Sequence, residues 1–232
     1  MVHPNITTSN TNNVSIILND YRTLVLLGDA NPCQCSIMIS DKTEHTKGNT
    51  TVNTLTDNIL KVYDAATDAD RIEGSEWYPV ANQIATTLHD NIDVASAVIA
   101  ALSPRMPWER NIECAREVID TGTTKCLGNS LRKALTALTG NLDGLFDKAT
   151  SKKTKNFWMA IANPLGKNNA VIDIHALGVA LGRRASESDY NDLKLVGAYE
   201  FVADSYMMAA IRRGVHVNVM QATTWVTWRK AL

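Results

Sequence analysis

The sequence predicts a mainly α-helical protein with a small β appendage near the N-terminus. From about Thr56 to the end, apolar residues recur at spacings of three and four, which is typical of helices that bury one face. A pattern typical of strands is confined to residues 15–29. With 232 residues and 45% hydrophobic content, the chain can bury one large core or form two lobes that share a cleft.

The first 55 residues are expected to form an N-terminal extension with short strands. Residues 1–13 are rich in Asn and Thr and are expected to be disordered. Residues 15–29 predict two short strands or a hairpin around Asn19–Asp20, and residues 31–54 predict a loop. Residues 56–232 then form the helical domain.

Helices are expected along the rest of the chain, separated by polar turns and prolines. One begins near Thr56 and closes in the run 64–70, the next carries Pro79 early, and Asp93 caps the third. The others are expected from Trp108, around Arg132 and Lys133, over about 153–162, after Asp173, as one or two helices in 186–214, and at the C-terminal end.

Charge and composition exclude several classes of protein. No segment reaches the ~18 apolar residues of a membrane span, and the polar start does not resemble a signal peptide, so we expect an intracellular, cytoplasmic protein without membrane contact. The four cysteines lack zinc, iron–sulfur or disulfide spacing and are expected to be buried thiols, with no metal and no cofactor.

The net charge of −1 is unevenly distributed along the chain. Residues 1–99 hold 5 basic and 12 acidic residues (−7), residues 100–170 hold 11 and 6 (+5), and residues 171–232 hold 7 and 6 (+1). A polyanion would therefore meet the middle segment. Asymmetry of this size also occurs in globular proteins without functional meaning.

Four lysines gather where the helix over 153–162 begins: Lys148, Lys152, Lys153 and Lys155. Lysines at a helix N-terminus oppose the helix dipole, so this placement costs stability unless an anion such as a phosphate binds there. A phosphate site and a solvated lysine turn are both open readings of this segment.

Asp173 stands between a short apolar run and a helix. Asp is a favoured N-cap, and Ile172 and Leu177 fall at the positions of a hydrophobic staple. A helix cap alone would therefore explain this residue. Upstream, Pro104 and Pro107 force a rigid loop that leaves Arg105 on an exposed corner.

Three segments, taken in order, resemble the helix-hairpin-helix DNA glycosylases. KKTKNFWMAIA (152–162) is similar to that family's K-T-x-N segment, VIDIHALGVALGRR (171–184) to its V-D-x-H helix start, and ALSPRMPWERNIECA (101–115) to its L-S-x-Q-T stretch. The resemblance covers residues 101–184 and implies a two-lobed helical bundle with a helix-hairpin-helix-like element. The family's L-P-G-V-G hairpin and C-terminal four-cysteine cluster are absent, and DKATSKK stands in place of the hairpin.

The resemblance implies roles residue by residue. Asp173 matches the family's catalytic aspartate, Lys153 (or Lys155, with a shifted hairpin) its lysine nucleophile, and Arg105 its intercalating position. It implies a cleft lined by 101–115 and 148–184. The remaining candidates are DNA contacts at Trp108, Lys148, Lys152, Lys155, His175 and Arg183, and base-pocket walls at Trp158 and Trp77, for which a core role is the competing interpretation.

The expected function is therefore a DNA glycosylase that flips a modified base out of double-stranded DNA and breaks its N-glycosidic bond. Strand-cleaving lyase activity is left open, and a branch from phages or from antiviral defence is expected. No protein partner is evident. One alternative is a base-hypermodification enzyme on the same fold. Another is a non-catalytic helical DNA-binding module in which Asp173 only caps its helix.

Overall fold

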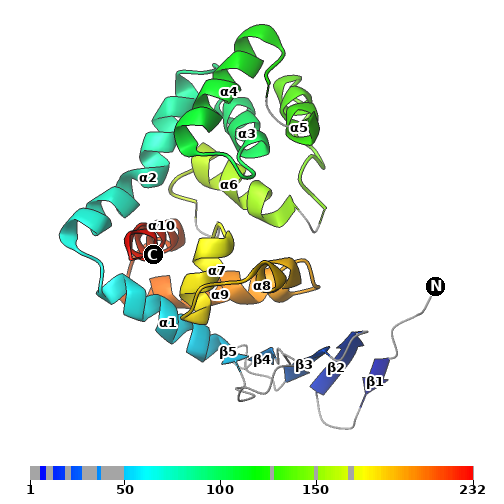
Figure 1. Cartoon of the computed structure of the whole chain (residues 1–232), viewed down its shortest axis with the longest axis vertical. Helices are drawn as coiled ribbons and strands as arrows, with labels where there is room; N and C mark the ends of the chain where they lie inside the picture. Colours follow the sequence, from blue (N-terminus) through cyan, green and yellow to red (C-terminus); the bar gives the residue numbers. More distant parts are fainter. Residues whose placement is uncertain are drawn as a thin grey trace.

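The computed structural model describes residues 6–8, 13–18, 22–27, 36–37, 50–125, 128–148, 151–166 and 170–231, with side chains from residue 52 onward except that of Asn129. The described chain is mainly helical, which confirms the predicted class (Figure 1). Within it, no helix is both long and apolar enough to span a membrane.

Short strands precede the helices. β1 (Ile6–Thr8), β2 (Asn13–Leu18) and β3 (Arg22–Leu27) form an antiparallel sheet in chain order, and β4 (Ser36–Ile37) pairs with β5 (Thr50–Thr51). β2 and β3 lie largely in the segment predicted as two strands, while the predicted turn at Asn19–Asp20 lies outside the described residues. The expectation of disorder was wrong for β1, because its β-branched residues pair with β2.

Ten helices follow in the described chain: α1 Val52–Asp64, α2 Asp68–Thr86, α3 Ile92–Leu102, α4 Trp108–Thr121, α5 Gly128–Leu138, α6 Lys152–Ala162, α7 Ile174–Leu181, α8 Glu187–Asp192, α9 Ala198–Arg213 and α10 Val217–Lys230. α2 begins earlier than predicted, because Thr67 closes a capping box with Asp70, and Pro79 therefore lies well inside it. Asn91, not Asp93, caps α3, since its side chain accepts the N–H groups of Asp93 and Val94.

The helices pack around two hydrophobic cores. The first core is built by α2 to α6, and the second by α1, α7, α9 and α10. Figure 1 shows α3 to α6 in the upper half and α1, α7, α8 and α9 in the lower half, with α2 running between the halves on one side. α10 serves both cores, because Ala222 belongs to the first and Met220 to the second.

α10 is fixed against α2 by a close backbone approach. A Cβ added at Gly74 on α2 would lie 2.4 Å from the Cα of Thr223 on α10, so only glycine allows this contact. Because α10 belongs to both cores, this contact helps to set how the two halves meet.

Cys114 on α4 is fully buried, but it forms a disulfide, so the expectation of a buried thiol was wrong. Its partner cysteine lies outside the described residues. Sequence spacing could not show this pairing, because a disulfide depends on Cα atoms coming within about 7 Å in the folded chain.

Candidate functional site

The segment that leads to Asp173 runs along the boundary of the two cores. Ala170 and Ile172 belong to the second core and Val171 to the first, as expected of an extended chain whose side chains alternate in direction. Tyr199 holds the segment, since its hydroxyl donates to the Ala170 carbonyl (2.9 Å) and accepts the Ile172 N–H (3.1 Å). Asp173 therefore lies where the halves meet.

Asp173 is the N-cap of α7, which confirms the predicted cap. Its Oδ1 accepts the backbone N–H groups of His175 (3.0 Å) and Ala176 (2.8 Å). Ile172 and Leu177, the predicted staple pair, are both buried in the second core. The cap therefore uses one carboxylate oxygen and leaves the other available.

The second oxygen of Asp173 has a partner far away in the sequence. Oδ2 accepts a hydrogen bond from the indole Nε1–H of Trp225 on α10, at 2.9 Å. Two backbone N–H groups and one indole N–H thus converge on a partly buried carboxylate. Asp173 therefore caps α7 and also joins it to α10 through Trp225.

Lys153 reaches the same region from the first turn of α6. Its Nζ donates to the hydroxyl of Ser103 (3.3 Å), which donates onward to the Ala100 carbonyl (2.9 Å), and it lies 5.2 Å from the ring centre of Phe157. Burial lowers the pKa of the Lys153 ammonium, and the charge of Asp173 acts against this shift. The Lys153 ammonium and the Asp173 carboxylate therefore lie close enough for their charges to interact at the boundary of the two cores.

Aromatic rings surround this pair. Trp77 lies 5.0 Å from Trp108, 5.8 Å from Phe157 and 6.3 Å from Trp225, centre to centre, and Tyr78 packs edge-on against it at 4.9 Å. We call these five residues the aromatic cluster. Burial, and after it the charge of Asp173, raise the pKa of Tyr78, so the phenol stays neutral. The three tryptophans are partly exposed and offer ring surface for stacking.

A protein-family model described as "Family of unknown function (DUF7178)" matches residues 41–232. The chain belongs to the DUF7178 family. The matched range contains every residue of the site described above. No curated protein and no solved structure matches the chain.

Arg105 of this DUF7178 protein stands beside the site in a strained conformation. Its backbone φ is +59°, the one positive value at a non-glycine residue in the described chain, and its side chain is exposed. The turn closes on itself, because the Met106 N–H donates to the Ser103 carbonyl at 3.2 Å. Such strain costs about 1 kcal/mol or more and tends to occur at functional sites. Ser103 links this loop to Lys153.

The other lysines of the predicted cluster are distributed around α6. Lys152 pairs with Glu200 on α9 (2.6 Å) and Lys155 with Asp147 (2.7 Å), while Lys148 is exposed. These carboxylates offset part of the dipole penalty that suggested a bound phosphate. Lys152 and Lys155 are therefore paired with carboxylates, and the structure does not hold them as unpaired phosphate ligands.

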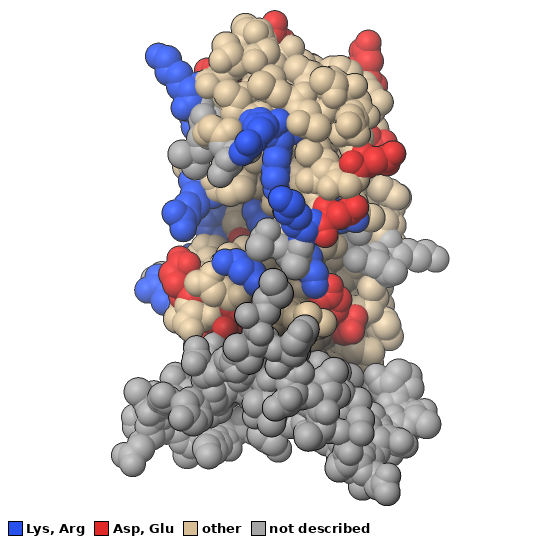
Figure 2. Space-filling model, turned by 90° about the vertical axis from the view of Figure 1, so that its right-hand side faces the viewer, with Lys and Arg blue, Asp and Glu red and all other residues tan. Residues whose placement is uncertain are grey.

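Basic side chains nevertheless collect on one face. Figure 2 views the right-hand side of Figure 1 and shows lysine and arginine side chains around a hollow at mid-height, between the upper and lower halves. Arg183, one of the predicted DNA contacts, is exposed and held by two parallel hydrogen bonds to Asp189 (2.8 and 3.0 Å). His175 packs its ring edge-on against Trp225 at 6.4 Å.

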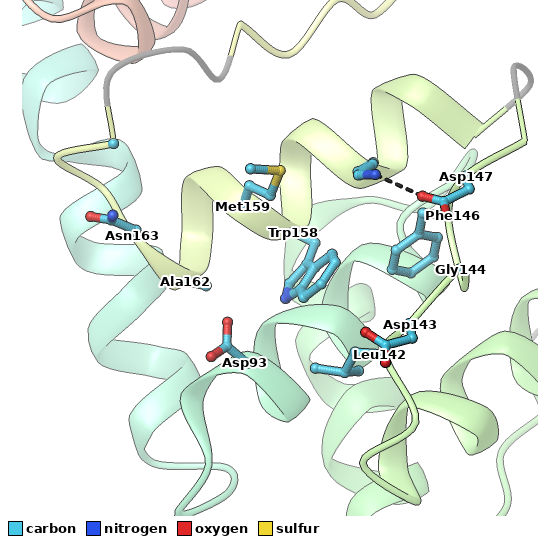
Figure 3. Close-up of a pocket in the computed structure, with 12 residues that line it drawn as sticks. Asp93, Leu142, Asp143, Gly144, Phe146, Asp147, Trp158, Met159, Ala162 and Asn163 are labelled. Carbon is cyan, nitrogen blue, oxygen red and sulfur yellow. Dashed lines mark hydrogen bonds and ion pairs between the residues drawn. The ribbon is translucent and has the colours of Figure 1, made fainter.

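Two predicted site residues point away from Asp173. Lys155 and Trp158 line a cavity of about 670 Å³ on the other face of α6, together with Asp93, Phe146 and Asp147 (Figure 3). Successive helix residues are about 100° apart, so 155 and 158 face away from 153 and 157. The structure therefore groups Lys153, not Lys155, with Asp173, and does not bring Trp158 to that group.

Three residues of the site were not predicted: Ser103, Phe157 and Trp225. Phe157 could have been found, because it shares a helical face with Lys153. Trp225 could not, because its partner is 52 residues away in the sequence. Across the described part of the chain, no three His, Cys, Asp or Glu side chains are grouped as metal ligands would be.

Proposed function

We propose that this DUF7178 protein is a DNA glycosylase that releases a flipped, modified base. The observation that carries the proposal is that Lys153 and Asp173 both contact the aromatic cluster at the boundary of two helical cores, Lys153 through Phe157 (5.2 Å) and Asp173 through the Trp225 indole (2.9 Å). The resemblance to helix-hairpin-helix glycosylases assigns these two residues to the reaction independently of where they lie in space.

The chemistry of base removal suits this pair. As the N-glycosidic bond breaks, positive charge develops on the sugar and the departing base takes up a proton. The Asp173 carboxylate would stabilise that charge and orient the water that adds to C1′. In the lyase variant, the neutral Lys153 amine attacks C1′ instead, the base leaves with a proton, and the amine forms an imine with the opened sugar.

The surroundings supply what a flipped base needs. An enzyme that acts on a base must take it out of the stack and hold it between aromatic surfaces. The exposed ring surfaces of the aromatic cluster lie beside Asp173, and Arg105 stands exposed on a strained loop that Ser103 ties to Lys153. The basic face around the hollow in Figure 2 would meet the phosphate backbone.

Mass spectrometry of released small molecules tests the proposal. The wild-type protein is incubated with a panel of DNAs, unmodified and naturally hypermodified, beside Asp173→Asn and a matched control, Asn91→Ala. Asn91 caps α3 by the same pattern of two N–H bonds, far from the proposed chemistry in sequence.

A free base that the wild type and Asn91→Ala release from one DNA, and Asp173→Asn does not, supports a glycosylase and identifies the substrate. No release from any DNA, with the DNA unchanged in mass, refutes it and favours a binding module. A gain in DNA mass without release favours base hypermodification.

A further inference from the structure

Trp225 is the donor on the carboxylate oxygen of Asp173 that the helix cap leaves free. A carboxylate offers about four acceptor positions, two on each oxygen. Both positions of Oδ1 are used by the backbone N–H groups of His175 and Ala176. Trp225 uses one position of Oδ2 and leaves one. That last position is the one through which Asp173 can act on a substrate.

The indole of Trp225 is itself held on several sides. The Arg229 guanidinium lies over its ring at 4.4 Å, one turn further along α10. The rings of Trp77 and His175 approach edge-on at 6.3 and 6.4 Å. Because a tryptophan side chain has only two rotatable bonds, these contacts leave the N–H little freedom in direction.

We propose that Trp225 is a positioning residue, which fixes the rotation of the Asp173 carboxylate so that the free acceptor position of Oδ2 faces the sugar of the flipped nucleotide. This role rests on the proposed function. A carboxylate capped through Oδ1 alone can still tilt about its Cβ–Cγ bond, and the indole N–H removes that freedom. Misplacement of a reacting group by about 1 Å can cost about a hundredfold in rate.

The competing interpretation is that Trp225 merely packs α10 against the body. Trp228 on the same helix provides the matched control, because it is also partly buried and packs against the second core. Its indole donates no hydrogen bond to any residue that the structure describes. Phe at either position removes the indole nitrogen and retains an aromatic ring.

The contact can be measured without any activity. The five tryptophans give up to five indole N–H signals in a proton–nitrogen correlation spectrum, and Trp225→Phe identifies the signal of Trp225 by its loss. In Asp173→Asn, which keeps a cap-competent side chain, we expect this signal to move more than the other indole signals. An unmoved Trp225 signal would overturn the proposal.

The role is measured with a defined probe, a DNA duplex that carries one abasic aldehyde. The Lys153 amine adds to the aldehyde carbon, water leaves, and borohydride reduces the imine to a stable cross-link. At saturating probe, Trp225→Phe should slow cross-linking about tenfold to a hundredfold, the usual effect of losing a hydrogen bond to a charged group. Trp228→Phe should stay within about twofold, and half-saturation should be unchanged in both.

A double variant separates positioning from packing. If Trp225 acts through Asp173, then Asp173→Asn with Trp225→Phe should react as slowly as Asp173→Asn alone, within about twofold. Multiplied losses in the double variant, or equal rates for Trp225→Phe and Trp228→Phe, would overturn the role of Trp225 while the glycosylase proposal stands. A wild type that forms no cross-link through Lys153 and releases no base would refute the proposed function and this role with it.

Discussion

Replacement of Asp173 by Asn separates the chemistry of this residue from its structural role. Asn is as good an N-cap as Asp, so its carbonyl oxygen can still accept the two N–H groups at the start of α7. The amide group then faces the Trp225 indole N–H, and that hydrogen bond is lost. We expect the free energy of unfolding to fall by about 1.5–3 kcal/mol, the contribution of one hydrogen bond to a charged group.

Base release should fall by at least about a hundredfold, because the negative charge next to the sugar is removed. Urea unfolding followed by tryptophan fluorescence gives the stability, and mass spectrometry gives the release rate on the same preparations. Asn91→Ala should cost about 1 kcal/mol through its lost cap and leave release unchanged. The reasoning fails if Asp173→Asn releases base within about twofold of the wild-type rate.

Three further predictions concern the amine, an ion pair and a helix contact. Cross-linking to an abasic duplex should vanish in Lys153→Ala. In the wild type the cross-linking rate should rise with pH, with a midpoint below the pKa of ~10.4 of an ordinary lysine, because burial lowers the pKa of Lys153. In Asp173→Asn this midpoint should be lower still, because the negative charge that opposes the shift is lost. A hydrogen bond from Arg183 is the main reason that the pKa of Asp189 lies at about 2. Asp189→Asn should therefore lower the free energy of unfolding by about 1 kcal/mol at pH 7, after allowance for solvent screening. In urea unfolding at decreasing pH, the difference in stability between the variant and the wild type should disappear as the pH falls through about 2. Gly74→Ala would place a Cβ 2.4 Å from the Cα of Thr223, so chemical denaturation should show a loss of about 3 kcal/mol, and an unchanged midpoint would contradict the close approach.

Most of the helices could be predicted because they bury one face and therefore carry a local periodic signal. α3 differs, since every residue from Val94 to Leu102 is buried, and α8 buries none. The starts of the helices were less certain, since several residues near one boundary can cap. Asn91 and Asp93 both suit an N-cap, and the first of them caps α3, which begins at Ile92. The capping box at Thr67 is a local pattern that would have placed the start of α2 correctly.

The residues of the candidate site also differ in whether the local sequence marks them. Asp173 could be singled out from its position between an apolar run and a helix, and the choice between Lys153 and Lys155 depended on which face of α6 looks toward it. Side chains two positions apart on a helix, such as those of Lys153 and Lys155, point in directions about 200° apart, so the choice between them needed the packing of α6. Trp225 carries no local signal at all, because its hydrogen bond exists only once α10 lies against both cores.

The cap of α7 and the proposed reaction do not compete for Asp173, because they use different oxygens. Oδ1 satisfies two backbone N–H groups that would otherwise lack a partner at the helix start. Those bonds anchor the side chain at the positive end of the helix dipole, where a negative charge is stabilised. Oδ2 then faces the boundary between the cores, held by Trp225. A helix cap at such a boundary is therefore a reason to suspect chemistry, since the cap supplies the rigidity that a reacting carboxylate needs.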